Sequence, residues 1–262
     1  MRINTTSLSG TKTLNARKIP KSIYASGTKN YKREYTDTFT SLGAWISLKA
    51  GWTFGTGDAV TTQPSTNYTL SVSDVQAKNI DAAIDLNKSG AGIAFWVESP
   101  NTWWAAIPYY TTNSEQYISS YYSCNCQQCC WGYYCRPAPQ TGCHSTCGSC
   151  GCWSCPNYST GTRYNYYLRI LQSVNGTVTV KQDTLFNTTL NDDTDNLTGL
   201  RVVTNGASII VYAKSNAGTY LATTNSYNAT EAPKGILTGI IFAPGGYAET
   251  ALIASFTTKA VE

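Results

Sequence analysis

Short runs in which apolar and polar residues alternate recur along most of the chain, separated by turn residues at intervals of about 8–12 residues. Runs of this kind that are rich in Val, Ile, Thr, Tyr and Trp are typical of β-strands, and segments with a helical period are nearly absent. The predicted strands are Trp45–Leu48, Gly51–Phe54, Tyr68–Val72, Ile80–Leu86, Gly92–Glu98, Trp103–Ile107, Tyr166–Leu171, Thr177–Val180, Leu200–Val203, Ser208–Ala213, Ile236–Phe242 and Leu252–Phe256. Such a set is large enough for two antiparallel sheets packed around a buried inner layer.

Two Asn-Gly pairs lie between neighbouring predicted strands. Asn175-Gly176 precedes Thr177–Val180, and Asn205-Gly206 precedes Ser208–Ala213. Asn-Gly is typical of the tight two-residue turn of a β-hairpin. The sequence therefore predicts a hairpin at each pair.

Residues 1–36 differ from the rest of the chain, because their apolar residues are isolated among Thr, Ser, Gly and Lys. This segment has too little apolar area to fold alone. We expect an extended arm that lies on neighbouring subunits, held by spaced apolar anchors and added β-pairing. The sandwich would then span residues 37–257, followed by a short tail at 258–262.

Charge adds little to this picture. The formal net charge is +4, and eight of the 19 basic residues lie within residues 1–40. These basic residues are spaced singly with few aromatic residues between them, which disfavours nucleic acid as a partner. No run approaches the roughly 18 apolar residues of a membrane span, and no apolar signal segment follows Met1.

All ten cysteines lie within residues 124–155. Cys-x2-Cys spacing lets two thiolates bind one tetrahedral zinc ion, so two structural zinc sites would use eight cysteines, with His144 as a substitute ligand. The candidate ligands are Cys124, Cys126, Cys129, Cys143, Cys147, Cys150, Cys152 and Cys155. A disulfide framework is the rival, because the count is even and the segment is small. Folding in a reducing cytosol would favour metal, and later exposure to oxidising solution would favour disulfides. In either case we expect a structural role.

The cysteines belong to an insertion, residues 111–162, that interrupts the predicted sandwich and is rich in tyrosine. Tyr and Trp side chains among Ser, Gly and Asn give large rigid contact area at low entropic cost. The candidate ligand-contact residues are Trp131, Tyr133, Tyr134 and Trp153. Calcium is not expected, because the acidic run at Asn191–Asn196 is explained by an ordinary hairpin turn.

The order of several short motifs resembles a known family. The motifs are Asp37-Thr38-Phe39, Gly92–Val97, Asn101–Ala106, Asn165–Ile170, Gly199–Val203 and Ile209–Tyr212. Together they resemble a concanavalin A-like (laminin G-like) jelly-roll sandwich of phage and bacterial surface proteins. With the arm and the Tyr/Cys-rich insertion, the chain looks like a bacteriophage virion protein. The resemblance implies an all-β antiparallel sandwich, but fold analogy does not settle function.

The sequence disfavours an enzyme. No glutamates are spaced as in Glu-x-Asp-x-Glu, and Asp81 and Asp85 fit a solvated strand face better than a catalytic pair. We expect a non-enzymatic virion structural protein, assembled in the host cytoplasm, that forms homo-oligomers and contacts other virion subunits through its arm. The first hypothesis is a tail-fibre-type adhesin for a host-surface glycan or protein. The second is an architectural cement, decoration or connector protein, and the third a cellular carbohydrate-binding module.

Overall fold

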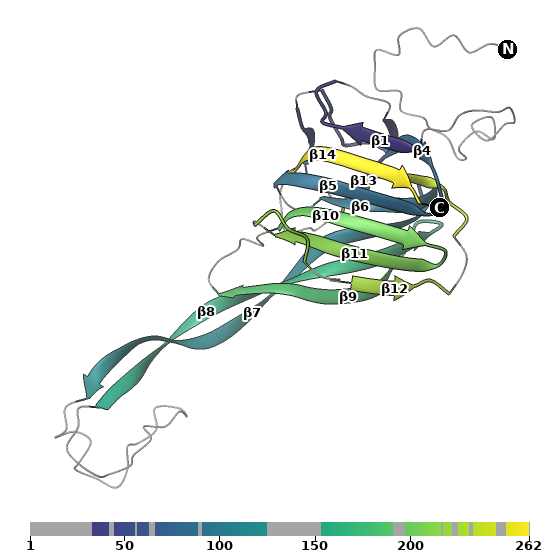
Figure 1. Cartoon of the computed structure of the whole chain (residues 1–262). Helices are drawn as coiled ribbons and strands as arrows, with labels where there is room; N and C mark the ends of the chain where they lie inside the picture. The colour runs from purple at the N-terminus through teal and green to yellow at the C-terminus, as the bar shows by residue number, and fades with distance from the viewer. Residues whose placement is uncertain are drawn as a thin grey trace, which may run out of the picture. The chain divides into compact units, whose positions relative to one another are not determined.

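The computed structural model describes residues 33–41, 45–55, 57–62, 66–88, 91–124, 153–190, 197–215, 217–221, 225–230, 233–244 and 250–261. These residues form fourteen strands (Figure 1). The strands are β1 (Glu34–Asp37), β2 (Ile46–Lys49), β3 (Ala59–Thr62), β4 (Thr69–Gln76), β5 (Ile80–Lys88), β6 (Ala91–Ser99), β7 (Thr102–Cys124), β8 (Trp153–Val174), β9 (Thr177–Leu190), β10 (Leu197–Asn205), β11 (Ser208–Ser215), β12 (Asn225–Asn228), β13 (Leu237–Phe242) and β14 (Thr250–Ala260). The described part contains no helix long and apolar enough to cross a membrane.

The chain divides into two compact units. The first consists of Met1–Thr111, Asn165–Thr188 and Thr194–Glu262, and the second of Thr112–Tyr164 and Thr189–Asp193. The strands of the first unit form the two antiparallel sheets of a sandwich, as the sequence predicted. Sheet A has the order β1-β14-β5-β10-β11-β12, with β3 also paired to β14. Sheet B has the order β2-β4-β13-β6-β7-β8-β9.

The core lies between the two sheets. Alternate residues of each strand point inward, as the period of two requires. Sheet A contributes Ile84, Val202 and Phe256, which are at most 1% exposed. Sheet B contributes Ile93 and Phe95 to the same cluster, both fully buried. Burial of large apolar side chains at about 1.5–3 kcal/mol each makes this layer the main source of stability.

A second apolar cluster lies on the other face of sheet B. It includes Leu70, Ala94 and Ile241, which are fully buried although they point away from sheet A. Tyr68 and Trp103 adjoin β4 and β7, which are separated by β13 and β6, yet their ring centroids lie 5.0 Å apart. Three strand spacings amount to about 14 Å, so the two side chains lean toward each other across β13 and β6. They therefore cover the small side chains beneath them.

Both predicted hairpins are present. Asn175 and Gly176 have φ values of 53° and 90°, which suit a two-residue turn with both central residues in the left-handed region. Gly206 has φ of 60°, and Asn205 pairs with Ser208 to close the second hairpin. These turns fix the registers of β8 with β9 and of β10 with β11.

Several strands differ in extent from the sequence prediction. The predicted strand Gly51–Phe54 makes only a single bridge, between Thr53 and Val60. An added Cβ at Gly51 would lie 2.3 Å from Cγ2 of Thr69, and its φ of 141° is one that other residues rarely adopt. At the other end of the chain β14 continues to Ala260, past the expected end of the sandwich at residue 257.

The second unit contains the far parts of β7 and β8. Ser119 Oγ donates to the carbonyl oxygen of Asn157 at 3.1 Å, and the carboxylate of Glu115 accepts hydrogen bonds from Arg163. In an antiparallel pair, the numbers of two facing residues have a nearly constant sum, because one strand runs forward as the other runs backward. Both links fit this rule, so the far parts of β7 and β8 are antiparallel. Parts of the predicted insertion on both sides of the cysteine cluster are therefore strand.

Candidate functional site

The outer face of sheet A carries an ordered set of polar side chains. Ile84, Val202 and Phe256 point into the core. Side chains alternate along a strand, so the residues directly before and after each of these three point outward. The register places Ser255, Asp85, Gly199 and Lys214 in one row across β14, β5, β10 and β11. A second row contains Thr257, Ala83, Arg201 and Tyr212, and a third contains Lys259, Asp81, Val203 and Ile210.

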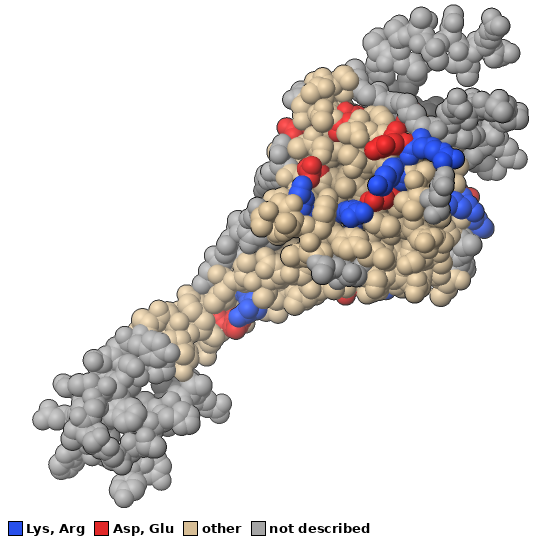
Figure 2. Space-filling view, in the orientation of Figure 1, with Lys and Arg blue, Asp and Glu red and all other residues tan. Residues whose placement is uncertain are grey.

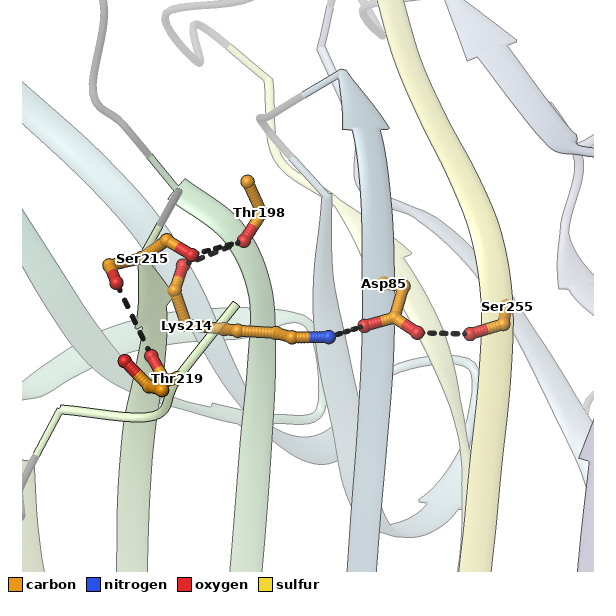
Figure 3. Close-up of polar contacts among 6 residues, drawn as sticks. All are labelled: Asp85, Thr198, Lys214, Ser215, Thr219 and Ser255. Atoms are coloured by element: carbon orange, nitrogen blue, oxygen red, sulfur yellow. Dashed lines mark hydrogen bonds and ion pairs between the residues drawn. The ribbon is translucent and has the colours of Figure 1, made fainter. Parts of the chain in front are cut away.

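Asp85 is the centre of the first row. The Lys214 ammonium donates to Oδ1 of Asp85 at 2.6 Å, and Ser255 Oγ donates to Oδ2 at 2.8 Å (Figure 3). Lys214 reaches Asp85 by crossing β10 at Gly199. A Cβ at Gly199 would lie 3.1 Å from Cδ of Lys214 and 2.5 Å from the carbonyl oxygen of Ile84. A side chain at that position would therefore hinder this ion pair.

Asp81 is the centre of the third row. Nε and Nη2 of Arg201 each donate to one oxygen of Asp81 at 2.8 Å, and the Lys259 ammonium lies 3.6 Å from Oδ2. Such a two-pronged contact fixes the plane of both groups. The guanidinium carbon of Arg201 also lies 5.6 Å from the ring centroid of Tyr212, within the range of a cation–π contact.

Ala83 lies between the two ion pairs. Asp81 and Asp85 are each two residues from it along β5, so their Cα atoms are about 13 Å apart. Ala83 has a short, half-buried side chain, and charged and tyrosine side chains surround it. Gly199 is buried beneath the side chain of Lys214. Figure 2 shows blue and red side chains intermixed over these strands, without a field of one sign. We call the residues Asp81, Ala83, Asp85, Gly199, Arg201, Tyr212, Lys214, Tyr220, Ser255 and Thr257 the Ala83 site.

Tyr220 closes the first row on the side of β11. It forms an isolated bridge with Lys214, whose ammonium lies 5.9 Å from the Tyr220 ring centroid. Burial is the main cause that raises the pKa of Tyr220, and the nearby carboxylate of Asp85 acts in the same direction. The phenol is therefore neutral at physiological pH and can both donate and accept a hydrogen bond.

The ion pair of Asp81 should be visible in the pH dependence of stability. Hydrogen bonds from Arg201 lower the pKa of Asp81, and partial burial opposes them. In the unfolded chain the pKa of an aspartate is about 3.9. A group whose pKa is lower in the folded state stabilises the fold above that pH, and this stabilisation is lost as the pH falls through the lower, folded-state pKa. We expect Asp81→Asn to lower the free energy of unfolding by about 1 kcal/mol at pH 7, with the difference shrinking below about pH 4. Urea denaturation at several pH values measures this, and a difference that does not change with pH would contradict it.

Asp81 lacks the property of a general acid. A general acid needs a raised pKa, whereas that of Asp81 is lowered by Arg201. The arrangement is suited to offering fixed hydrogen-bonding groups to a ligand.

Most site residues predicted from the sequence lie outside the described residues. These are Cys126, Cys129, Cys143, Cys147, Cys150, Cys152, Trp131, Tyr133 and Tyr134. Cys124 ends β7, and Trp153 and Cys155 lie at the start of β8. The zinc sites, the rival disulfides and the contact surface stay predictions. Among the described residues no group of three or more His, Cys, Asp or Glu side chains could hold a metal ion.

The structure places Asp81 and Asp85 on one strand face, as their spacing predicted. Their partners Arg201, Lys214 and Ser255 were not identified from the sequence. These residues are between 120 and 170 positions away along the chain from the aspartate that each contacts. Gly199 and Arg201 are two residues apart, which places both on one face of β10. This spacing does not tell which strand lies beside β10, so it could not identify the aspartate partners.

Comparisons with known proteins show distant structural likeness. No family model and no curated protein matches the sequence. A GH43 protein, BlXynB from Bacillus licheniformis, is similar in structure at 13% identity with a TM-score of 0.47, over 90% of this chain and 41% of that one. The chain thus spans about two fifths of the length of that protein.

Two further solved structures are similar over most of their own length. The exoplasmic/lumenal domain of VIP36, in a Ca2+/Man2-bound form, aligns at 11% identity and a TM-score of 0.45, over 87% of this chain and 88% of that one. The CBM2 module of the evolved Dit of Lactobacillus casei BL23 phage J-1 aligns at 6% identity and a TM-score of 0.32, over 90% of this chain and 94% of that one. These likenesses assign no residue role to the chain, whose sandwich is established by its own strand pairing.

Proposed function

We propose that the chain is a non-enzymatic glycan-binding protein of a bacteriophage virion, and that the Ala83 site binds a neutral oligosaccharide of the host surface. The observation that supports this most is the arrangement of fixed donors and acceptors around the short side chain of Ala83. Polar groups held by neighbours before binding cost little entropy when a ligand is bound. Sugar hydroxyls, each a donor and an acceptor, complement such a surface.

The balance of charge favours a neutral ligand. Asp81 is paired with Arg201, and Asp85 with Lys214. Arg201 uses two of its five N–H donors on Asp81, and Lys214 uses one of three on Asp85, so further donors remain for hydroxyl oxygens. With Lys259 beside Asp81, three cations face two carboxylates, and a net charge of +1 gives a charged ligand little long-range attraction.

The two tyrosines supply the apolar part of the proposed surface. Tyr212 and Tyr220 lie beside Arg201 and Lys214, at the β11 side of the site. A ring with one polar end suits a ligand that has C–H groups on its faces and hydroxyls at its edges. The virion part of the proposal is supported by the resemblance of the sequence motifs.

The test is binding of the full chain to an array of neutral and acidic bacterial oligosaccharides, followed by calorimetry. We expect neutral oligosaccharides to bind, with an affinity that changes little between low and high salt. Ala83→Trp should weaken binding by about 100-fold, because an indole at position 83 would occupy the space above β5 that the ligand needs.

Ser226→Trp is the matched control. Ser226 is the exposed cross-strand neighbour of Ile210, on the outer face of sheet A but beyond the Ala83 site. The Ser226→Trp variant adds the same indole ring outside the site and should leave the affinity for the oligosaccharide unchanged. A chain that binds no oligosaccharide, or an Ala83→Trp variant that binds as well as the original chain, would refute the proposal. A preference for acidic oligosaccharides with steep salt dependence would refute the neutral ligand.

A further inference from the structure

The two Asn-Gly pairs have a reactivity that the fold can control. The side-chain amide of an asparagine can be attacked by the backbone nitrogen of the next residue, and glycine hinders this attack least because it has no Cβ. Gly176 and Gly206 follow Asn175 and Asn205, and all four residues are exposed at hairpin turns. Water therefore reaches both pairs, so the hydrogen bonding of each glycine nitrogen decides how easily the attack occurs.

The reaction replaces an amide by a carboxylate. The glycine nitrogen forms a bond to Cγ of the asparagine, the bond from Cγ to Nδ2 breaks, and the proton of the glycine N–H leaves with the amide nitrogen as ammonia. A water molecule then opens the imide ring that has formed. Opening at Cγ gives aspartate, and opening at the backbone carbonyl gives isoaspartate, in which the main chain runs through the former side chain.

The two glycines are held by different kinds of acceptor. The N–H of Gly176 donates to the backbone carbonyl oxygen of Asn101 at 2.8 Å. The N–H of Gly206 donates to Oδ1 of Asn79, a side-chain atom, at 2.9 Å. Since a backbone N–H can only donate, the acceptor is the amide oxygen of Asn79 and not its NH2 group. The nitrogen of Gly206 has to lose this proton and turn toward Asn205 before it can attack.

Asn79 is held in place for this contact by its own backbone surroundings. It lies between β4 and β5, and its carbonyl oxygen accepts a hydrogen bond from the N–H of Val261 at 2.9 Å. The hydroxyl of Thr204, a fully buried residue, accepts from the N–H of Ile80 and donates to the carbonyl oxygen of Lys78, both at 3.0 Å. The segment that carries Asn79 is thus fixed to the end of β10.

We propose that Asn205 is a site of spontaneous deamidation, with water as the second reactant, and that Asn79 suppresses the reaction by holding the N–H of Gly206. The contact keeps the glycine nitrogen protonated and its hydrogen directed at Asn79. Asn205 pairs with Ser208 to close the hairpin of β10 and β11. Isoaspartate adds a carbon atom to the main chain, so the modification would disturb the register of these two strands. The proposal does not depend on glycan binding.

Asn175 is an internal control within the same chain. Its glycine is held by a main-chain oxygen, which no substitution at residue 79 removes. The N–H of Asn175 also donates to Oγ1 of Thr102 at 3.3 Å, at the same turn. Loss of the Asn79 contact should therefore leave the rate at Asn175 unaltered, whereas a general loosening of the fold would raise the rates at both asparagines.

The test follows deamidation in the full chain with its native sequence and in the variants Asn79→Ala and Asn79→Asp, incubated in neutral buffer at physiological temperature. Peptide mass spectrometry, with fragmentation that separates isoaspartate from aspartate, measures residues 175 and 205 over time. We expect Asn79→Ala to raise the rate at Asn205 about five- to tenfold, the factor that corresponds to one hydrogen bond, and to leave the rate at Asn175 unchanged. Asn79→Asp keeps an oxygen acceptor and should react at the native rate.

Hydrogen exchange at the amide of Gly206 gives a second measurement. Exchange followed by NMR should be faster in Asn79→Ala by a similar factor and unchanged in Asn79→Asp. An unchanged rate at Asn205 in Asn79→Ala, equal rates in the two variants, or an equal rise at Asn175 would each overturn the proposal. Circular dichroism checks the fold, and Asn79→Ser, which lacks an oxygen at the position of Oδ1, replaces Asn79→Ala where alanine prevents folding.

Discussion

Phe256→Ala is expected to lower the free energy of unfolding by about 3–5 kcal/mol, the range for truncating a fully buried aromatic side chain. Phe256 is 0% exposed and lies on the inner face of β14, the strand that pairs with β1, β3 and β5. Its ring centroid is 5.0 Å from that of Trp45 and 6.3 Å from that of Tyr35. Alanine would leave a cavity where the first strand of the sandwich joins the sheet.

The surroundings of Phe256 cannot easily collapse into that cavity. Asp37 accepts hydrogen bonds from Tyr35 Oη at 2.6 Å and from Trp45 Nε1 at 2.7 Å, which hold both rings in place. Since the cost of a cavity grows with the volume that remains open, the loss should lie in the upper part of the range.

Equilibrium urea denaturation followed by tryptophan fluorescence measures the effect of Phe256→Ala. Val180→Ala serves as the control, because Val180 is half exposed and its truncation should change the free energy of unfolding by no more than about 0.5 kcal/mol. A loss below about 1 kcal/mol for Phe256→Ala would show that β14 is not packed as described.

The sequence predicted the strands of sheet A because several of them have one buried and one partly exposed face, as β11 and β14 do. β10 alternates from Leu200 onward, with Leu200, Val202 and Thr204 buried and Arg201 and Val203 half exposed, so its period of two is plain in the sequence. The far part of β7, after Thr111, has no such contrast. Its residues are mostly exposed on both sides, as in the segment Thr112–Ser120, so periodicity could not distinguish it from an insertion loop.

Motifs were recognised in the sequence before their physical role could be known. Asp37-Thr38-Phe39 was one of the motifs that resemble the concanavalin A-like family. The structural role of Asp37, however, is to accept hydrogen bonds from three donors around its carboxylate. Two of these, Tyr35 Oη and the backbone N–H of Phe39, are local, whereas Trp45 comes from beyond β1. The Ala83 site shows the same limit more strongly, because sheet order, which local spacing does not encode, brings Arg201 to Asp81.

The second large effect is expected at Gly239, in β13 near the middle of sheet B. An added Cβ there would lie 1.9 Å from the carbonyl oxygen of Ser71 and 2.6 Å from Cα of Val72. These are backbone atoms of β4, so relief requires the two strands to move apart. β13 also pairs with β6 on its other side, and the register shifts on both sides between Leu237 and Gly239. The close approach is therefore enforced by two ladders at once.

Gly239→Ala should accordingly lower the free energy of unfolding by about 3 kcal/mol or more and reduce the yield of soluble protein. Gly218→Ala separates this crowding from backbone strain. Gly218 has φ of 75° with nothing within 4 Å of an added Cβ, so its substitution should cost only about 1 kcal/mol. Urea denaturation of both variants compares the two costs. If the two substitutions were equally damaging, steric contact with β4 would not be what fixes glycine at position 239, and the close pairing of β13 with β4 would need another explanation.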